Sequence, residues 1–94
     1  MHQPILPMTV PEALRIYHAP KHRNRLLAMH SLTLEEQAER LTQEVLRCSR
    51  LRAWYLQDGN YELALSEKDE GDACVELAQA ARTLHEESQR VPHI

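Results

Sequence analysis

Apolar residues recur at helical spacing near the start of the chain. The positions that share one helical face are Val10, Ala13, Leu14 and Tyr17. Thr9 and Glu12 stand three residues apart, as in a capping box that opens a helix. Pro20 disfavours helical geometry in the residue before it. We therefore expect a helix that starts after Thr9 and ends near residues 18–19.

A longer helix is expected after residue 33. Thr33 and Glu36 form a second capping-box pattern. Behind them, apolar residues recur at intervals of three and four, namely Leu34, Ala38, Leu41, Val45 and Cys48. Nothing breaks this pattern before about residue 50. Residues 26–30, between the two patterns, are expected to form a short helix.

Residues 53–65 favour a β-hairpin. Asp58-Gly59 lies between alternating apolar residues, which is a strong signal for a two-residue type I′ turn. Such a turn would pair Trp54 with Leu63 across the strands, with Leu65 continuing the same face. The segment contains no Val, Ile or Thr, and its Glu, Leu and Ala residues favour helix. The hairpin is our main expectation for this segment.

A helical form of the same segment is the alternative. It resembles a tetratricopeptide repeat, in which a Gly-Asp/Asn-Tyr-x-x-Ala turn joins two antiparallel helices. The residues that match the pattern are Leu51, Tyr55, Gly59, Tyr61 and Ala64. Beyond them, Lys68 and Gly71 stand where the pattern has a bulky apolar residue and a small one, and no second period follows.

The remaining residues predict a loop and a last helix. Residues 66–72 are polar and contain Gly71, so we expect a solvated loop there. Asp72 is placed to cap a final helix with an apolar stripe. The expected fold is a small, mainly α single domain with three to four helices and one β-hairpin at residues 53–65. The alternative is an all-α antiparallel helical bundle with a helical turn at Asp58–Asn60.

The ends of the chain set the expected domain limits. Residues 1–8 contain two prolines and no periodicity, which favours a flexible arm. We expect one domain over residues 9–90 and a short tail over residues 91–94. No stretch approaches about 18 apolar residues, and residues 1–7 lack the features of a signal peptide. These features predict a cytoplasmic protein without a membrane partner.

The composition predicts a thin core. The chain has 94 residues, with no Phe, one Trp and three Tyr, so packing depends on Leu, Ala and a few β-branched residues. A chain of this size buries only about 60–65% of the surface that its unfolded form exposes. A core of this kind is often completed by a partner or a second copy. Cys48 and Cys74 lie among apolar positions and are expected to be buried, unpaired thiols.

No motif in the sequence indicates an enzyme, a cofactor or a metal site. His18 and His22 are four residues apart, but Pro20 lies between them and no further ligands are local. Adjacent acids such as Glu35 and Glu36 are typical of a solvated helix start. Nucleotide-binding loops, nucleophile elbows and zinc-protease motifs do not occur in the sequence. We therefore expect neither catalysis nor a cofactor.

Charge is divided unequally along the chain. Residues 1–30 hold four Lys/Arg and one acid, whereas residues 31–94 hold seven Lys/Arg and thirteen acids. Arg15 and Lys21 suit the C-terminal end of the first helix, where cations meet exposed carbonyls. Arg23 and Arg25 have no such local role and are candidates for contact with a partner.

DNA binding is the alternative function. Helices followed by a hairpin and a closing helix resemble a winged-helix domain, and residues 32–41 are similar to the opening helix of many helix-turn-helix units. Arg47 and Arg50 share one edge of the long helix and would extend a local Arg/Lys face. Two features differ from the winged-helix pattern: no turn signal occurs in residues 42–44, and the expected wing tip is acidic.

The sequence favours a small, non-enzymatic protein-interaction module over DNA binding. Such a module would be a regulator, an adaptor or an accessory subunit of a larger complex. A homodimer is also expected, because a lone hairpin leaves strand edges that a second copy could cover. Aromatic and arginine side chains are favoured anchors in interfaces. The candidate partner-binding residues are Arg23, Arg25, Arg47, Arg50, Tyr55 and Tyr61.

Overall fold

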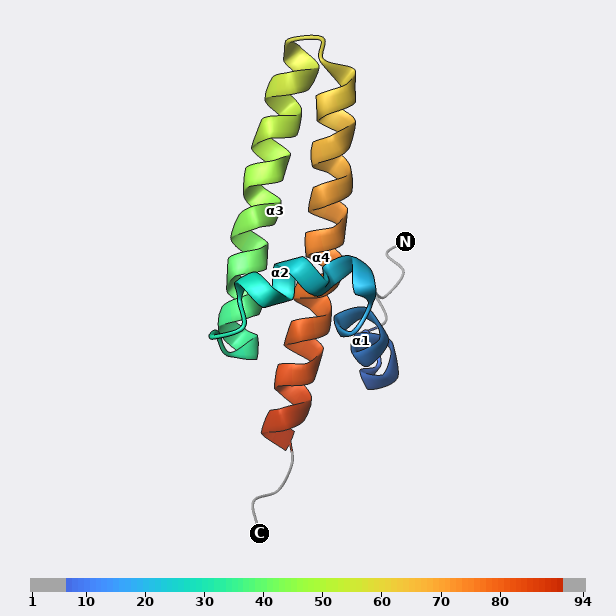
Figure 1. Cartoon of the computed structure of the whole chain (residues 1–94), viewed down its shortest axis with the longest axis vertical. Coiled ribbons are helices and arrows are strands. Elements are labelled where there is room, and N and C mark those ends of the chain that lie inside the picture. The colour runs from blue at the N-terminus through green and yellow to red at the C-terminus, as the bar shows by residue number, and fades with distance from the viewer. Residues whose placement is uncertain (1–6, 91–94) are drawn as a thin grey trace, which may run out of the picture.

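The fold is a long helical hairpin crossed near one end by short helices. The computed structural model describes residues 7–90. In chain order these form α1 (Val10–Tyr17), a 3₁₀ turn η1 (Pro20–His22), α2 (Arg23–Ala28), α3 (Leu34–Gln57) and α4 (Tyr61–Arg90). Helices α3 and α4 lie antiparallel, while α1 and α2 pack at the lower half of the hairpin (Figure 1). The arm over residues 1–8 falls almost entirely outside the described residues, and the tail at 91–94 falls wholly outside them.

The predicted helix starts are confirmed at both Thr9 and Thr33. The Thr9 hydroxyl accepts a hydrogen bond from the Glu12 backbone N–H at 3.3 Å, so α1 begins where the sequence indicates. At α3 the box is reciprocal: Thr33 Oγ1 accepts from the Glu36 N–H, and Glu36 Oε1 accepts from the Thr33 N–H. Each bond satisfies an amide that would otherwise lack a partner at the start of the helix.

The β-hairpin expected at residues 53–65 is wrong, and the all-α alternative fits. Between residues 7 and 90 the chain forms no strand. A type I′ turn requires positive φ at both central residues, but Asp58 is helical at φ −85° and only Gly59 is positive, at +76°. The Asn60 N–H bonds to the Tyr55 carbonyl, and the Gly59 N–H bonds to the Leu56 carbonyl, which is a Schellman ending of α3.

Asn60 then opens α4, so one three-residue turn both ends a helix and begins the next. Its side-chain oxygen accepts a hydrogen bond from the Leu63 N–H at 3.3 Å. Helices α3 and α4 together extend from residue 34 to residue 90, which is longer than the 34-residue unit of a tetratricopeptide repeat. The resemblance is therefore limited to the turn.

The loop expected at residues 66–72 is also wrong. Helix α4 is continuous through this polar run. Lys68 and Asp72 form an ion pair at 2.9 Å with the i, i+4 spacing that stabilises helices. Gly71, which suggested a break, lies inside the helix where α4 meets Cys48 of α3. A polar surface and one glycine do not interrupt a helix whose other face is packed.

The core lies where α1 and α2 meet the lower half of the hairpin. Its members are small or aliphatic, namely Met29, Leu41, Cys74, Leu77 and Ala78, with Ile16, Tyr17, Leu26, Leu32 and Val45 packed around them. This thin core agrees with the composition. None of the helices described between residues 7 and 90 is long and apolar enough to cross a bilayer.

Candidate functional site

A groove of about 530 Å³ lies between the end of α1, η1, α2 and the start of α3. Tyr17, Pro20, Leu26 and Leu27 supply most of its apolar lining. Polar side chains at its margin come from His18, Arg23 and His30, and its lining contains no acid. The groove therefore combines apolar contact area with positive charge, which is a combination suited to recognising a partner.

Gln37 fixes the base of the groove. The Tyr17 hydroxyl donates a hydrogen bond to Gln37 Oε1 at 2.8 Å, which joins α1 to α3. Gln37 Nε2 donates to the carbonyls of Met29 and Leu32, at 3.2 Å each, and so holds the α2–α3 connection. A buried amide that satisfies three groups on two segments holds the walls of the groove at a set separation.

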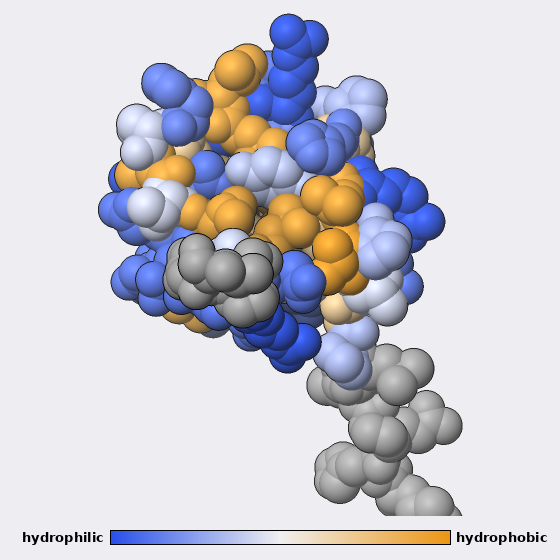
Figure 2. Space-filling view, turned by 90° about the horizontal axis from the view of Figure 1, so that it is seen from below, coloured by the Kyte–Doolittle hydropathy of each residue, from blue (hydrophilic) through white to orange (hydrophobic). Residues whose placement is uncertain are grey.

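Leu27 and Arg23 are among the exposed residues of the groove. Leu27 is 58% exposed, although it is a large apolar residue. Arg23 is exposed and forms no ion pair with any residue between 7 and 90. Figure 2 shows this lower end of the molecule, where hydrophobic atoms gather in a patch surrounded by hydrophilic ones. An exposed apolar side chain therefore lies beside an arginine that has no ion pair within the described residues.

No family model matches the chain, and neither a curated protein nor a solved structure is significantly similar to it. Evidence for function therefore comes from the geometry of its surfaces.

A polar cluster around the buried His22 holds the wall of the groove against α4. His22 is fully buried, and its Nε2 lies 3.0 Å from Glu76 Oε2, while Nδ1 lies 3.5 Å from Arg25 Nη1. Because Arg25 can only donate, the ring is assigned as the tautomer with hydrogen on Nε2, which donates to Glu76. Lys21 Nζ lies 2.7 Å from the same Glu76 oxygen. The hydrogen bond from Lys21, assisted by His22, holds the pKa of Glu76 below its ordinary value.

Arg25 belongs to this structural cluster. Its Nε donates to Glu70 Oε1 at 3.1 Å, its Nη2 donates to Glu70 Oε2, and its Nη1 donates to the Lys21 carbonyl at 2.9 Å. The bond to Glu70 is the main cause that raises the pKa of Arg25. A guanidinium engaged by both carboxylate oxygens fastens α2 to α4 and has little capacity left for a partner.

The other predicted partner residues lie on the hairpin, away from the groove. Arg47 pairs with Glu44 one turn before it on α3, and this hydrogen bond lowers the pKa of Glu44. Arg50 is exposed on the same helix. Tyr55 and Tyr61 flank the turn at the tip, where Tyr61 is 70% exposed. The six predicted residues are therefore divided between the α2 region and the hairpin and do not form one continuous positive face.

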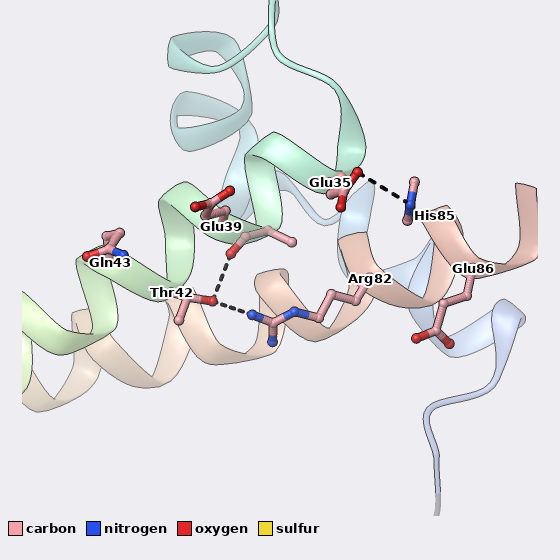
Figure 3. Close-up of a pocket in the computed structure, with 8 residues that line it drawn as sticks. Glu35, Glu39, Thr42, Gln43, Arg82, His85 and Glu86 are labelled. Carbon is pink, nitrogen blue, oxygen red and sulfur yellow. Dashed lines mark hydrogen bonds and ion pairs between the residues drawn. The ribbon is translucent and has the colours of Figure 1, made fainter. Parts of the chain in front are cut away.

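A second hollow lies between the first half of α3 and the last part of α4 (Figure 3). It encloses about 330 Å³ and carries mixed charge. Arg82 extends from α4 to the Thr42 hydroxyl on α3, and His85 Nε2 lies 3.8 Å from Glu35 Oε2. The two basic side chains are thus engaged within the chain, and the hollow lacks the apolar lining of the groove.

The cysteines and histidines are poorly placed for chemistry. Cys48 and Cys74 are buried and unpaired, as expected, and burial raises the pKa of both thiols, that of Cys48 to about 12. His18 lines the groove, whereas His22 is bonded to Glu76. Among residues 7–90 no group of three or more His, Cys, Asp or Glu is arranged to hold a metal ion.

Sequence reasoning identified Arg23 but missed most of the groove. Tyr17, Leu27, His30 and Gln37 come from three segments that meet only through tertiary packing. Leu27 carried one detectable signal, because it is an apolar residue directly after a basic run. The Gln37 bonds to Tyr17 and to the α2–α3 connection had no local signature.

Proposed function

We propose that this chain is a small, non-enzymatic, cytoplasmic interaction module that binds an acidic amphipathic segment of a partner protein in its groove. A regulator, an adaptor or an accessory subunit would use such a site. The observation that carries the proposal is the exposed Leu27 beside Arg23, which has no ion pair within residues 7–90, in a groove without acids.

Leu27 and Arg23 favour different chemical features in the same ligand. Full burial of an exposed Leu side chain contributes about 1.5–3 kcal/mol, and Leu27 is 58% exposed, so an apolar anchor on the partner gains part of this free energy by covering Leu27. An arginine binds a carboxylate through two parallel hydrogen bonds, which favours an Asp or Glu close to that anchor. A peptide with apolar residues on one side and acids beside them satisfies both features, as in helix-in-groove recognition.

Charge pairing within the chain makes duplex DNA the weaker candidate. DNA binding depends on several free cations that neutralise phosphates. Of the four predicted arginines, Arg25 is engaged by Glu70 and Arg47 by Glu44. The winged-helix resemblance required a β-hairpin wing, and residues 53–65 form parts of two helices and their connecting turn instead. One arginine beside apolar residues is better matched to a protein segment.

A peptide library displayed on phage and panned on the full chain tests the proposal. Enriched peptides should place Asp or Glu next to large apolar residues, and Arg23→Glu should reduce their binding about tenfold or more, as loss of one charge-assisted pair implies. Arg40→Glu makes the same charge change on an exposed arginine of α3 outside the groove and should bind normally. Basic consensus peptides, or equal loss in both variants, would contradict the proposal.

A further inference from the structure

Two of the four histidines that the structure describes lie in the groove. His18 and His30 are both exposed and both line it. The other two, His22 and His85, lie 3.0 Å and 3.8 Å from carboxylate oxygens elsewhere in the fold. Neither groove histidine forms an ion pair with an acid from residues 7–90. An acid that meets these two rings must therefore come from another molecule.

The hydrogen bond of the His30 ring determines what this ring offers to a ligand. Its Nδ1 lies 3.0 Å from the Leu27 carbonyl oxygen. Because a carbonyl only accepts, the neutral ring is assigned as the tautomer with hydrogen on Nδ1, and Nε2 then carries a lone pair. An ionised carboxylate also only accepts, so it gains nothing from that lone pair. Protonation converts Nε2 into a donor and gives the ring a positive charge.

The His18 ring stands against the wall of the groove. It lies edge to face with the ring of Tyr17, with 5.6 Å between the centroids and 86° between the planes. Tyr17 is itself held by the hydrogen bond from its hydroxyl to Gln37. The contact places an exposed imidazole beside the apolar lining, where protonation adds a second positive charge to the groove.

The rest of the groove lining carries one permanent positive charge and no negative one. Arg23 is the charged residue, and the Tyr17 hydroxyl and the Gln37 amide are neutral and bonded to each other. With both histidines protonated the lining holds three positive charges. Positive charges in one hollow repel one another, and a bound carboxylate offsets that repulsion.

Charged residues on the surrounding elements lie outside the groove lining. Arg15 stands one turn before the C-terminal cap of α1. Lys21 of η1 and Arg25 of α2 pair with acids of α4. In the first turn of α3, Glu36 bonds to the helix cap and Glu35 lines the other hollow. The acids of α3 are therefore engaged or directed elsewhere.

We propose that His18 and His30 take up protons together with the acidic partner, so that the groove binds this partner more tightly at mildly acidic pH. The inference rests on the groove ligand proposed above. Imidazole side chains ordinarily change charge between about pH 5 and 8. A carboxylate ligand stabilises the charged ring, so the complex holds protons that the free chain releases. Affinity therefore rises as the pH falls from about 7.5 to 5.5, while Arg23 contributes equally throughout.

Carboxylates on both molecules stay ionised in this range. Asp and Glu in a flexible peptide titrate near about 3.9 and about 4.3, so the ligand keeps its charge at pH 5.5. Glu76, which joins η1 to α4, has a pKa held below the ordinary value of 4.5 by Lys21 and His22. The expected change in affinity therefore arises at the groove histidines.

Calorimetric titration of the full chain with the acidic peptide that panning enriches most strongly tests the inference. The wild type should bind it about three- to tenfold more tightly at pH 5.5 than at pH 7.5, as two partly exposed charge pairs imply. His18→Gln and His30→Gln should each lose part of this ratio, and the double variant H18Q/H30Q should have a ratio near one. His85→Gln removes a histidine outside the groove and should keep the wild-type ratio.

Proton uptake gives a second measurement that needs no variant. Titration at pH 6.5 in two buffers of different ionisation enthalpy should show that the wild type takes up protons with the peptide. A wild-type ratio near one, no proton uptake, or an unchanged ratio in H18Q/H30Q would overturn the inference. The groove proposal would survive these results, because Arg23→Glu tests it at pH 7.5 alone. Panning that enriches no acidic peptide at either pH would overturn both.

Discussion

At the scale of single residues, the buried His22 connects two segments of the fold. Both ring nitrogens are engaged, by Glu76 and by Arg25, and through them the ring joins η1 to α4. No buried side-chain nitrogen or oxygen among residues 7–90 lacks a hydrogen-bond partner. A polar cluster that is fully satisfied can hold a thin core in one arrangement, because any alternative packing would leave one of these groups unpaired.

Replacing His22 with alanine should lower the free energy of unfolding by about 2–4 kcal/mol, since it opens a cavity and removes one partner of Glu76. Urea denaturation followed by circular dichroism measures this loss. His30→Ala removes an exposed ring and should change stability by less than about 0.5 kcal/mol. A similar small effect for both variants would show that the cluster does not hold α2 in place.

At the scale of elements, the caps and the Asp58–Asn60 turn determine where the helices begin and end. Gly59 adopts φ +76° to complete the ending of α3, and only glycine does so without steric cost. Gly71 has no such requirement. A Cβ there would lie 3.4 Å from the Cys48 Cβ, which is ordinary contact. The backbone conformation therefore requires glycine at residue 59 but not at residue 71.

Gly59→Ala should destabilise the fold by about 1–2 kcal/mol, the cost of a left-handed residue with a Cβ. Gly71→Ala should instead stabilise it by about 0.5–1 kcal/mol, because alanine has the higher helix propensity and the space is sufficient. Thermal or urea unfolding of the two variants checks the opposite signs. Destabilisation of equal size in both would mean that α4 is not continuous through residue 71.

The sequence predicted the capping residues well, but it misassigned the Asp58-Gly59 turn and the 66–72 segment and gave no indication of the tertiary contacts. Thr9 and Thr33 were identified as helix starts because their capping bonds span only three residues. Asp58-Gly59 was misassigned because the dipeptide suits both a type I′ turn and a helix ending, and the packing of two long helices favoured the second. Arg25 was predicted to bind a partner because the carboxylate that it pairs with, Glu70, lies 45 residues away in the chain. No local pattern in the sequence connects the two residues.

At the scale of the whole molecule, ionised acids stabilise the fold, and one of them, Glu76, joins η1 to α4. Three acids have a pKa held below the ordinary value by hydrogen bonds: Glu36 through Thr33, Glu44 through Arg47, and Glu76 through Lys21. A depressed pKa in the folded state means that the unfolded chain binds more protons as the pH falls. The stabilisation is therefore complete at neutral pH and is lost on acidification below the ordinary value of about 4.5.

Unfolding free energy measured from pH 7 to pH 3 should fall most steeply below about pH 4.5. Glu76→Gln should lower stability at pH 7, because Lys21 and His22 lose a charged acceptor, and should flatten part of the acid slope. Glu12→Gln removes an exposed acid outside the ion pairs of residues 7–90 and serves as the control. An unchanged slope in Glu76→Gln would rule out this carboxylate as a source of acid sensitivity.

The exposed position of Trp54 also determines what fluorescence spectroscopy can report about this protein. It is the only tryptophan in the chain, and its indole lies on the bare tip beside Tyr55 rather than in the core. Intrinsic tryptophan fluorescence therefore reports the surroundings of the tip. It is insensitive to changes in the core formed by α1, α2 and the lower half of the hairpin. The protein thus carries an intrinsic fluorophore on the surface of its helical hairpin, and no added dye is needed to observe a change in the surroundings of the tip.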